Sequence, residues 1–366
     1  MLKRVAVIIL AVVMLFSLAA CNSGGGSQPA STGSPPASSG GGDNQDTAPA
    51  PADPIEWNLG AVFADPAATD AYTNGIFMKT FSELVAERSQ GQLIVNCYYS
   101  SVLGSQPEMF DQVRRGEQNA FFGQAMASAD SRFGVFSVPY TFRDINQVKQ
   151  LIASPGAPLF QLAQGWMEEN NAVLVATGQG VFRDIFNSKH AVQSVDDVRD
   201  LKLRIYEDPV VHTFWDNLCN ATVMPVSEIY SGLQTKVIDG LEFESTALVS
   251  EGFAEIVTYF SDINWQWVWN WNLIVSKSDW DALTPELQAI VTDCAYEALD
   301  VLAVSSDEYR KSIDQVLADE HGIEVYKLTD AERQTWIDYA ATLKDDFRDV
   351  IGADTFDSVQ AIVGGN

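Results

Sequence analysis

Two arginines in the middle of the chain are the residues whose type and surroundings most directly suggest a chemical role. Arg183 lies within residues 181–186 and Arg204 within residues 201–206. Both segments are otherwise rich in aliphatic and aromatic residues, which predicts short strands. A guanidinium group keeps its proton, so an arginine in a buried strand needs a carboxylate or a similar partner. The pair therefore indicates either an anion-binding cleft or two arginines neutralised by internal acids.

An ordered series of motifs surrounds these arginines between residues 178 and 244. The series consists of an arginine strand ending in Asn187, DVRDLKLR ending at Arg204, MPVSEIYSGLQT from Met224, and DGLE ending at Glu242. It resembles the core of the DctP-type substrate-binding proteins of TRAP (tripartite ATP-independent periplasmic) transporters. A coarser similarity extends from Ile55 to near the C-terminus.

The resemblance implies an α/β, two-lobed fold of the periplasmic-binding-protein type, with a hinge and one long helix spanning both lobes. Lobe I would contain residues 55–179 and about 269–308, and lobe II residues 180–268 and about 309–362. Strand–helix alternation over residues 56–122 predicts a mostly parallel sheet, with ligands outside the carboxyl ends of its strands. Helices are expected at 69–88 and, as one very long helix, at 285–320. A strand at 322–327 and two short helices are expected to finish the chain.

Both the resemblance and the strand ends predict ligand-binding residues. By resemblance, Arg204 holds a ligand carboxylate in a bidentate fork, and Arg183 holds a second anionic or polar group. The ends of the predicted strands add Phe63, Asp65 and Gln124 to the cleft. For Asp65, helix capping is an equally good explanation.

The chain departs from the family pattern at this site. After the motif that contains Glu242, Phe243 and Glu244 replace the family's Asn and Pro, and Arg204 is followed by Ile-Tyr-Glu207. A carboxamide contact is thus lost and carboxylates are added, unless Glu207 and Glu244 point to solvent. This pattern favours a ligand with one carboxylate and one amino group over a simple dicarboxylate. The alternative is a metal ion on Glu242 that bridges to a keto or hydroxy acid.

Four tryptophans occur at every second position between residues 264 and 275. They are Trp265, Trp267, Trp269 and Trp271. A period of two would place all four indoles on one face of a strand. Either they pack in the core between the lobes, or one or two of them, with Trp267 as the candidate, line the cleft.

The first residues predict export and lipidation. Lys3 and Arg4 precede an apolar run at residues 5–16, and Leu-Ala-Ala leads directly to Cys21. This pattern is typical of a bacterial lipoprotein signal peptide at 1–20 with Cys21 as the lipidated N-terminus. The apolar run is too short to span a bilayer comfortably. Residues 21–54 lack large apolar side chains and are expected to form a disordered, lipid-anchored linker.

Composition excludes several function classes. The formal net charge of −27 argues against nucleic acid and anionic membrane surfaces as partners. Cys97, Cys219 and Cys294 are far apart, with no metal-ligand spacing and at most one disulfide between them. The three histidines are scattered, and no catalytic or cofactor motif is present.

We therefore expect an extracytoplasmic solute-binding protein, lipid-anchored to the cell membrane, without enzymatic activity or cofactor. It would capture a small organic acid or zwitterion between its lobes and deliver it to TRAP membrane subunits. The alternatives are a lipid-anchored extracytoplasmic hydrolase, a solute sensor that feeds a signalling receptor, and a tethered structural or adhesive module.

Overall fold

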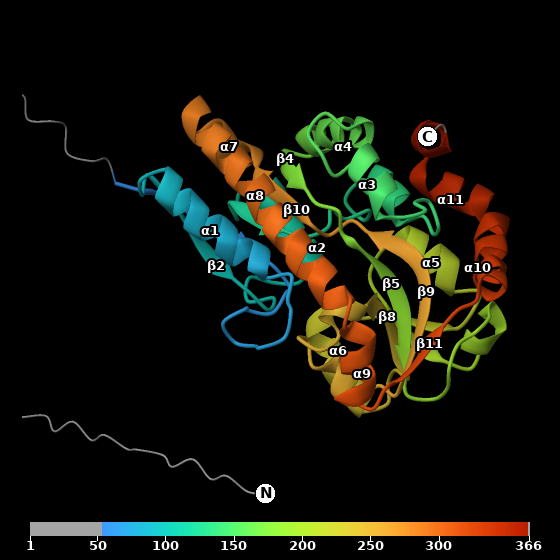
Figure 1. The fold of residues 1–366 in the computed structure, drawn as a ribbon. Helices are drawn as coiled ribbons and strands as arrows, with labels where there is room; N and C mark the ends of the chain where they lie inside the picture. Colours follow the sequence, from blue (N-terminus) through green and yellow to red (C-terminus); the bar gives the residue numbers. More distant parts are fainter. Residues whose placement is uncertain (1–52, 365–366) are drawn as a thin grey trace, which may run out of the picture. The chain divides into compact units, whose positions relative to one another are not determined.

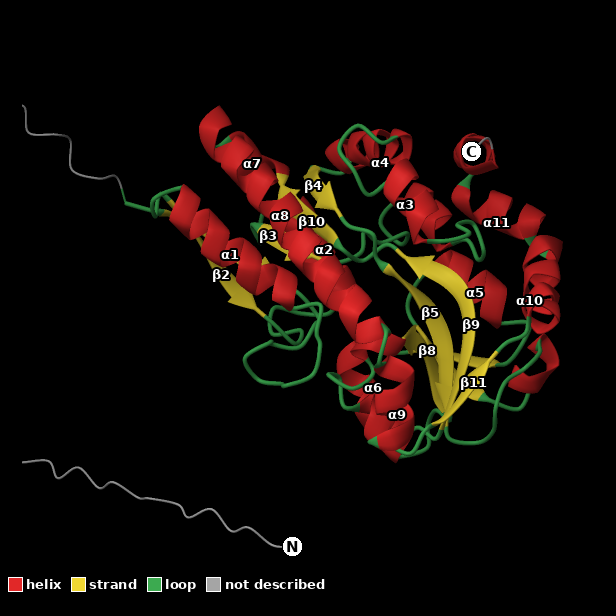
Figure 2. Ribbon diagram, in the orientation of Figure 1, coloured by secondary structure: helices red, strands yellow, loops and turns green. Residues whose placement is uncertain are grey.

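Two β-sheets form the framework of the protein in the computed structural model, which describes residues 53–364 (Figure 1). The predicted signal peptide, Cys21 and the predicted linker up to residue 52 lie outside the described residues. Helices pack around both sheets (Figure 2). Within residues 53–364, no helix is long and apolar enough to cross a membrane.

The first sheet has five strands. Their order is β2 (Leu93–Tyr98), β1 (Ile55–Gly60), β3 (Ala120–Phe122), β10 (Asn272–Ser276) and β4 (Ala172–Thr177). β1 is parallel to β2 and β3, as the strand–helix alternation predicts. β10, by which the chain re-enters this sheet from the second one, is antiparallel to both β3 and β4. Four strands of this sheet therefore run in one direction and β10 runs in the other, so the sheet is mostly parallel, as predicted.

The second sheet has six strands. Their order is β11 (Glu324–Lys327), β9 (Tyr259–Val268), β5 (Val181–Asn187), β8 (Gly240–Glu244), β6 (Lys202–Ile205) and β7 (Asn220–Val223). β5 is antiparallel to β8 and β9, whereas β6 is parallel to β7 and β8. β8 therefore lies between the two strands that carry the arginines.

The chain passes between the sheets through two short segments that contact each other. Residues 178–180 connect β4 to β5, residues 269–271 connect β9 to β10, and Gly178 N donates to Trp271 O at 2.8 Å. Gly180 has a φ of +56°, and a Cβ there would lie 2.5 Å from Val268 O. Only glycine accommodates both constraints.

The helices can be grouped by their position relative to the two segments in which the chain crosses between the sheets. Those before the first crossing are α1 (Ile76–Arg88), α2 (Gln106–Arg114), the 3₁₀ helix η1 (Ser131–Ser137), α3 (Ile145–Leu151) and α4 (Pro158–Glu169). Those between the crossings are η2 (Val195–Val198), α5 (Pro209–Trp215), α6 (Val226–Gln234), η3 (Ser245–Ala247) and η4 (Phe253–Glu255). The last are α7 (Lys277–Asp281), α8 (Pro285–Arg310), α9 (Ile313–Asp319), α10 (Asp330–Thr342), α11 (Lys344–Ile351) and α12 (Ala353–Gly364).

The longest helix, α8, extends along both halves of the described chain (Figure 1). It packs on α1 and β4 beside the first sheet and on η3, which directly follows β8 of the second sheet. The C-terminal helices also contact both parts, since α11 packs on α5 whereas α12 packs on α4 and η1.

Three helix predictions are wrong, two in their bounds and one in the number of helices. Residues 69–75 are not helical, because Thr69 and Thr73 use their hydroxyls in local bonds to Ala71 N and Ala64 O. The helix expected to continue to residue 320 ends at Arg310, and the separate helix α9 follows. Three helices rather than two finish the chain.

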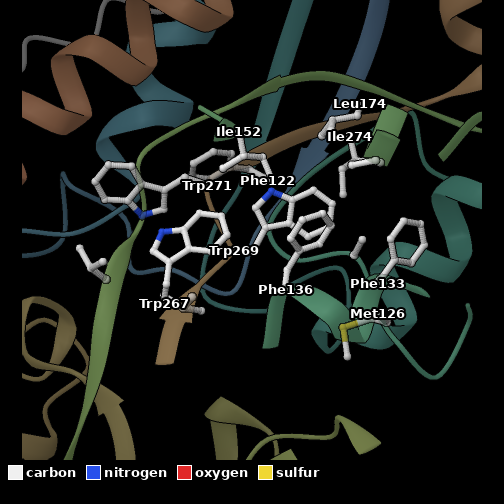
Figure 3. Close-up of a cluster of buried hydrophobic side chains, with 14 of the residues drawn as sticks. Phe122, Met126, Phe133, Phe136, Ile152, Leu174, Trp267, Trp269, Trp271 and Ile274 are labelled. Carbon is white, nitrogen blue, oxygen red and sulfur yellow. The ribbon is translucent and has the colours of Figure 1, made fainter. Parts of the chain in front are cut away.

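The four alternating tryptophans are all buried but do not share one strand face. β9 is irregular opposite Asp184, with Asn264 at a φ of +45°, and it ends before Trp269. The indole of Trp269 lies 4.3 Å from the ring of Phe136, in a cluster that also contains Trp267 and Trp271 (Figure 3). Trp265 instead stacks on Phe214 at 5.1 Å and meets Trp215 edge-on at 5.2 Å. All four indoles are core residues.

Replacing Trp265 with alanine should lower the free energy of unfolding by about 3–5 kcal/mol, because the fully buried indole would leave a cavity next to Phe214 and Trp215. Urea denaturation followed by circular dichroism measures this. Val304→Ala, at a side chain on α8 that is 64% exposed, is the matched control and should change the value by less than about 0.5 kcal/mol. Equal effects of the two substitutions would contradict the assignment.

Candidate functional site

A cavity of about 510 Å³ opens where strand ends of both sheets meet. The first sheet contributes residues that follow β1, β2 and β3, among them Phe63, Ser100 and Gln124. The second sheet contributes residues at or after the ends of β6, β7 and β8, together with Arg183 of β5. This position, outside the carboxyl ends of parallel strands, is the one that the sequence predicts.

Arg183 is anchored to Glu242 of the neighbouring strand. Its Nε donates to the Glu242 carboxylate and its Nη2 to the backbone oxygen of Glu242 at 2.9 Å. The guanidinium also lies over the rings of Tyr206 and Phe243, 4.9 and 5.4 Å from their centroids. Burial acts to lower the pKa of Arg183, but the charge of Glu242 raises it above its ordinary value. Arg183 is therefore a rigid, permanent cation in the cavity wall.

Arg204 approaches the same carboxylate from the other side of β8, but less closely. Its Nη1 lies 3.5 Å from Glu242 Oε1, and neither atom has a hydrogen-bond partner within the described chain. The Nε of Arg204 donates to Met224 O at 2.8 Å. Burial is the main cause that lowers the pKa of Arg204, to about 10, so the group remains charged at neutral pH. Arg204 thus keeps unused donors although only 2% of its surface is exposed.

Glu244 is a second buried acid, and it lines the cavity. One carboxylate oxygen accepts from Asn74 Nδ2 at 3.0 Å, and the other accepts from Asn270 Nδ2. The Nη1 of Arg183 is 3.9 Å from Glu244 Oε1. Burial raises the pKa of Glu244 above its ordinary value, whereas Arg183 and the two amides oppose the rise. Glu244 therefore does not point to solvent.

A hydrogen-bonded network behind the cavity contains another buried acid. Gln124, which lines the cavity, donates to Ser137 Oγ at 3.3 Å, and Ser137 donates to Asp208 Oδ2 at 2.7 Å. Tyr206 OH lies 3.2 Å from Ser137 Oγ and accepts from Gln266 Nε2 at 2.7 Å. Burial is the main cause that raises the pKa of Asp208 to about 6.

The structure brings most of the predicted site residues to this cavity. Those that line it are Arg183, Arg204, Phe63, Gln124, Glu207, Phe243 and Glu244. Glu207 is exposed to solvent, whereas Phe63 and Phe243 are buried. Whether these residues bind a ligand stays a prediction.

The other three predicted residues do not line the cavity. Asp65 accepts a bond from Ala67 N at 2.8 Å in a local turn, and it caps no helix because α1 begins only at Ile76. Glu242 lies behind the cavity wall, fully buried between the two arginines. Trp267 is a core residue whose Nε1 donates to Gln179 O at 2.7 Å. Its expected position in the cleft is therefore wrong.

Several cavity residues are absent from the sequence-based prediction. Asn270 and Glu251 lie in loops without a recognisable motif, and the first turns of α2 and α6 also reach the cavity. Asp208 does carry a local signal, because Asp followed by Pro209 is typical of a helix start, and its carboxylate caps α5 through Val210 N at 2.8 Å. Its bond to the distant Ser137 has no such signal.

Neither a metal cluster nor a disulfide is found in the part of the chain that the structure describes. No group of three His, Cys, Asp or Glu side chains there could hold a metal ion. The thiols of Cys97, Cys219 and Cys294 are free. Glu242 is occupied by two arginines, so it is not placed as a metal ligand for the cavity.

Comparison with known proteins identifies the class. A model of the family described as bacterial extracellular solute-binding protein, family 7 (DctP) matches residues 64–349. The chain belongs to this family. It is accordingly a DctP-type substrate-binding protein of the TRAP class, as the motifs between residues 178 and 244 predict. Members of this family bind solutes and are not enzymes, which agrees with the predicted absence of catalysis.

Curated relatives cover most of the family region. A solute-binding protein of Chromohalobacter salexigens is 29% identical over 231 residues, which are 62% of this chain and 68% of the relative. The 2,3-diketo-L-gulonate-binding periplasmic protein YiaO of Escherichia coli is 27% identical over 72% of this chain and 79% of its own. The C4-dicarboxylate-binding periplasmic protein DctP of Rhodobacter capsulatus is 24% identical over 86% of this chain and 93% of the relative.

Solved structures confirm the fold class. The sugar acid binding protein DctPAm from Advenella mimigardefordensis, in complex with galactonate, has a TM-score of 0.77 at 22% identity and covers 86% of this chain and 99% of its own. A TRAP periplasmic solute-binding protein from Sulfitobacter with bound β-D-galacturonate has a TM-score of 0.76 at 23% identity, with coverage of 85% and 100%. The predicted two-lobed α/β fold is therefore correct.

The buried Asp208 predicts a defined pH dependence of stability. Its pKa is about 6 in the folded protein against an ordinary value of 3.8, so the folded state binds the proton more tightly than the unfolded state. Stability from this group is present below about pH 4 and is lost as the pH rises through 6. Relative to Asp208→Asn, the wild type should lose about 2–3 kcal/mol of unfolding free energy between pH 4 and pH 7.

Parallel urea titrations of the two proteins across this range measure the difference directly. Asparagine retains the helix-capping oxygen, so the comparison isolates the proton. A difference between the two proteins that is constant across pH would show that Asp208 does not titrate in this window.

Proposed function

We propose that this protein is an extracytoplasmic lipoprotein that captures a small organic acid between two lobes and delivers it to TRAP membrane subunits. The observation that carries the proposal is Arg204, a guanidinium in the cavity wall whose Nη1 lacks a hydrogen-bond partner within residues 53–364. A ligand carboxylate would be held by its terminal nitrogens in a bidentate fork.

Arg183 would contribute a second contact from the same wall. Its Nε and Nη2 are held by Glu242, so Nη1 is the nitrogen left to meet a ligand. Phe63 and Phe243 would cover an apolar part of the molecule. The named ligands of the relatives, such as galactonate, galacturonate and 2,3-diketo-L-gulonate, all carry a carboxylate.

The lobes in this proposal have the bounds expected from the sequence, residues 55–179 with about 269–308 and residues 180–268 with about 309–362. Each β-sheet takes its strands from one of these sets. The bonded segments 178–180 and 269–271 would act as the hinge, with a ligand that contacts both lobes favouring closure.

Arg204→Ala and Arg204→Lys should each weaken binding of the cognate acid by about 100-fold or more, because lysine cannot reproduce the planar fork. A thermal-shift screen of organic acids identifies a ligand for the wild type, and calorimetry then measures both variants. Arg348→Lys, at an exposed ion pair with Asp357, is the matched control and should bind normally. Native affinity in Arg204→Lys would contradict the anchor role.

Cys21→Ser should release the protein from the membrane fraction. In the sequence, Cys21 directly follows the Leu-Ala-Ala of the signal peptide, and residues 22–54 offer no other means of membrane insertion. Immunoblots of washed membranes and of the soluble fraction measure the distribution. Persistence of the processed variant in washed membranes would exclude lipidation as the anchor.

A further inference from the structure

Acidic side chains outnumber basic ones in the cavity wall. The only cations that line it in the described chain are Arg183 and Arg204. The acids that line it are Glu108, Glu207, Glu228, Glu244 and Glu251. An anion-binding site that had evolved for a dianion would need an excess of positive charge, and this wall has the opposite balance.

The innermost charges already cancel without any ligand. Arg183 and Arg204 supply two positive charges, and Glu242 and Glu244 supply two negative ones. Burial raises the pKa of Glu244, whereas Arg183 and the hydrogen bonds from the two amides oppose that rise and favour its ionised form. A dianion would therefore leave two uncompensated negative charges in a buried site, whereas a zwitterion would leave none.

One acceptor in this wall has no donor. Because a carboxylate can only accept, the bond from Asn270 to Glu244 fixes the amide orientation, with Nδ2 toward Glu244 and Oδ1 on the other side. Asn270 is 5% exposed and lines the cavity, and its Oδ1 is buried without a hydrogen-bond partner in the described residues. A hydrogen-bond donor that reached this carbonyl would satisfy it, and the ammonium group of a ligand could supply that donor.

Glu251 adds a further acceptor to the same wall. Its Oε1 accepts from Ala64 N at 3.2 Å. Burial, with a smaller contribution from the charge of Glu244, raises the pKa of Glu251 to about 7. No side-chain cation contacts Glu251 among residues 53–364, so its second carboxylate oxygen is free to accept from a ligand.

We infer that Glu244, Asn270 and Glu251 form a cation subsite, and that the ligand is a small amino acid or related zwitterion. Its carboxylate binds at Arg204 and its ammonium group at the cation subsite. This inference rests on the proposed function, since it takes the Arg204 end as the carboxylate site. A protonated amine has three N–H donors, enough for Asn270 Oδ1 and the two carboxylates.

Matched sets of compounds that differ in one group test the inference. The sets are phenylalanine, phenyllactate and benzylmalonate; 4-aminobutanoate, 4-hydroxybutanoate and glutarate; and glucosaminate, gluconate and glucarate. Each is titrated into the full wild-type protein by thermal shift, to tens of millimolar, and by calorimetry where a shift occurs. In any set that binds, the amino compound should bind about tenfold or more tightly than the hydroxy acid, and the dianion should bind weakest.

Two isosteric variants test the subsite itself. Glu244→Gln and Glu251→Gln should each reduce the ratio of amino-acid to hydroxy-acid affinity by about tenfold, and this ratio, rather than either affinity alone, is the measured result. A purely structural role would weaken both ligands equally and leave the ratio unchanged. Glu324→Gln, an exposed residue of β11, is the control. Circular dichroism checks that each variant is folded. If Glu244→Gln does not fold, Glu251→Gln alone tests the subsite.

The outcomes separate this inference from the proposed function. If a dianion or hydroxy acid binds most tightly, or if both variants leave the ratio unchanged, the cation subsite is wrong, but an organic-acid receptor remains. If no compound in any set stabilises the wild type, the organic-acid function fails together with the inference.

Discussion

The carboxylate of Glu242 is the constraint on which the cavity wall depends. β8 lies between β5 and β6, so one acid on the central strand faces an arginine from each neighbour. Two guanidinium groups buried side by side would repel each other strongly without it. The arrangement is asymmetric, because Glu242 bonds Arg183 directly but lies 3.5 Å from Nη1 of Arg204. One arginine is thereby fixed as part of the structure, and the other keeps donors for a ligand.

The position of this wall depends in turn on how the chain passes between the sheets. The segments 178–180 and 269–271 lie against each other, and Gly180 allows the close approach to Val268 O. Arg183 follows Gly180 by only three residues, and Asn270 lies within the second segment. The two crossings therefore place a cation and an amide of the site as well as connecting the sheets. α8 packs against this region, since a Cβ at Gly178 would lie 2.8 Å from Leu299.

Local sequence patterns predicted features that depend on neighbouring residues, such as the positions of strands and the residues at their ends. The strands of Arg183 and Arg204 are apolar enough to be recognised to within about two residues, and the strand-end rule located Phe63 and Gln124. The period-two pattern of the tryptophans failed because the irregularity of β9 is a tertiary feature with no local signature. Likewise, Ser137 and Asp208 are 71 residues apart, and their bond forms only through the fold. The sequence shows an excess of negative charge, but it does not show which carboxylates are neutralised by arginines within the fold.

Glu244 connects the electrostatics of the cavity to the contact between the sheets. Its carboxylate lies at the end of β8 in the second sheet, yet it accepts a hydrogen bond from Asn74, in the loop between β1 and α1 of the first sheet. Glu251 makes an equivalent contact to the backbone of Ala64 in the same loop. The strength of both bonds depends on the charge of the carboxylate, since charge-assisted bonds are stronger than neutral ones. In the proposed binding mode, a ligand group that stabilises these carboxylates in their ionised form would also strengthen the contacts between the two sheets, which would couple charge recognition to closure of the cavity through the same two side chains.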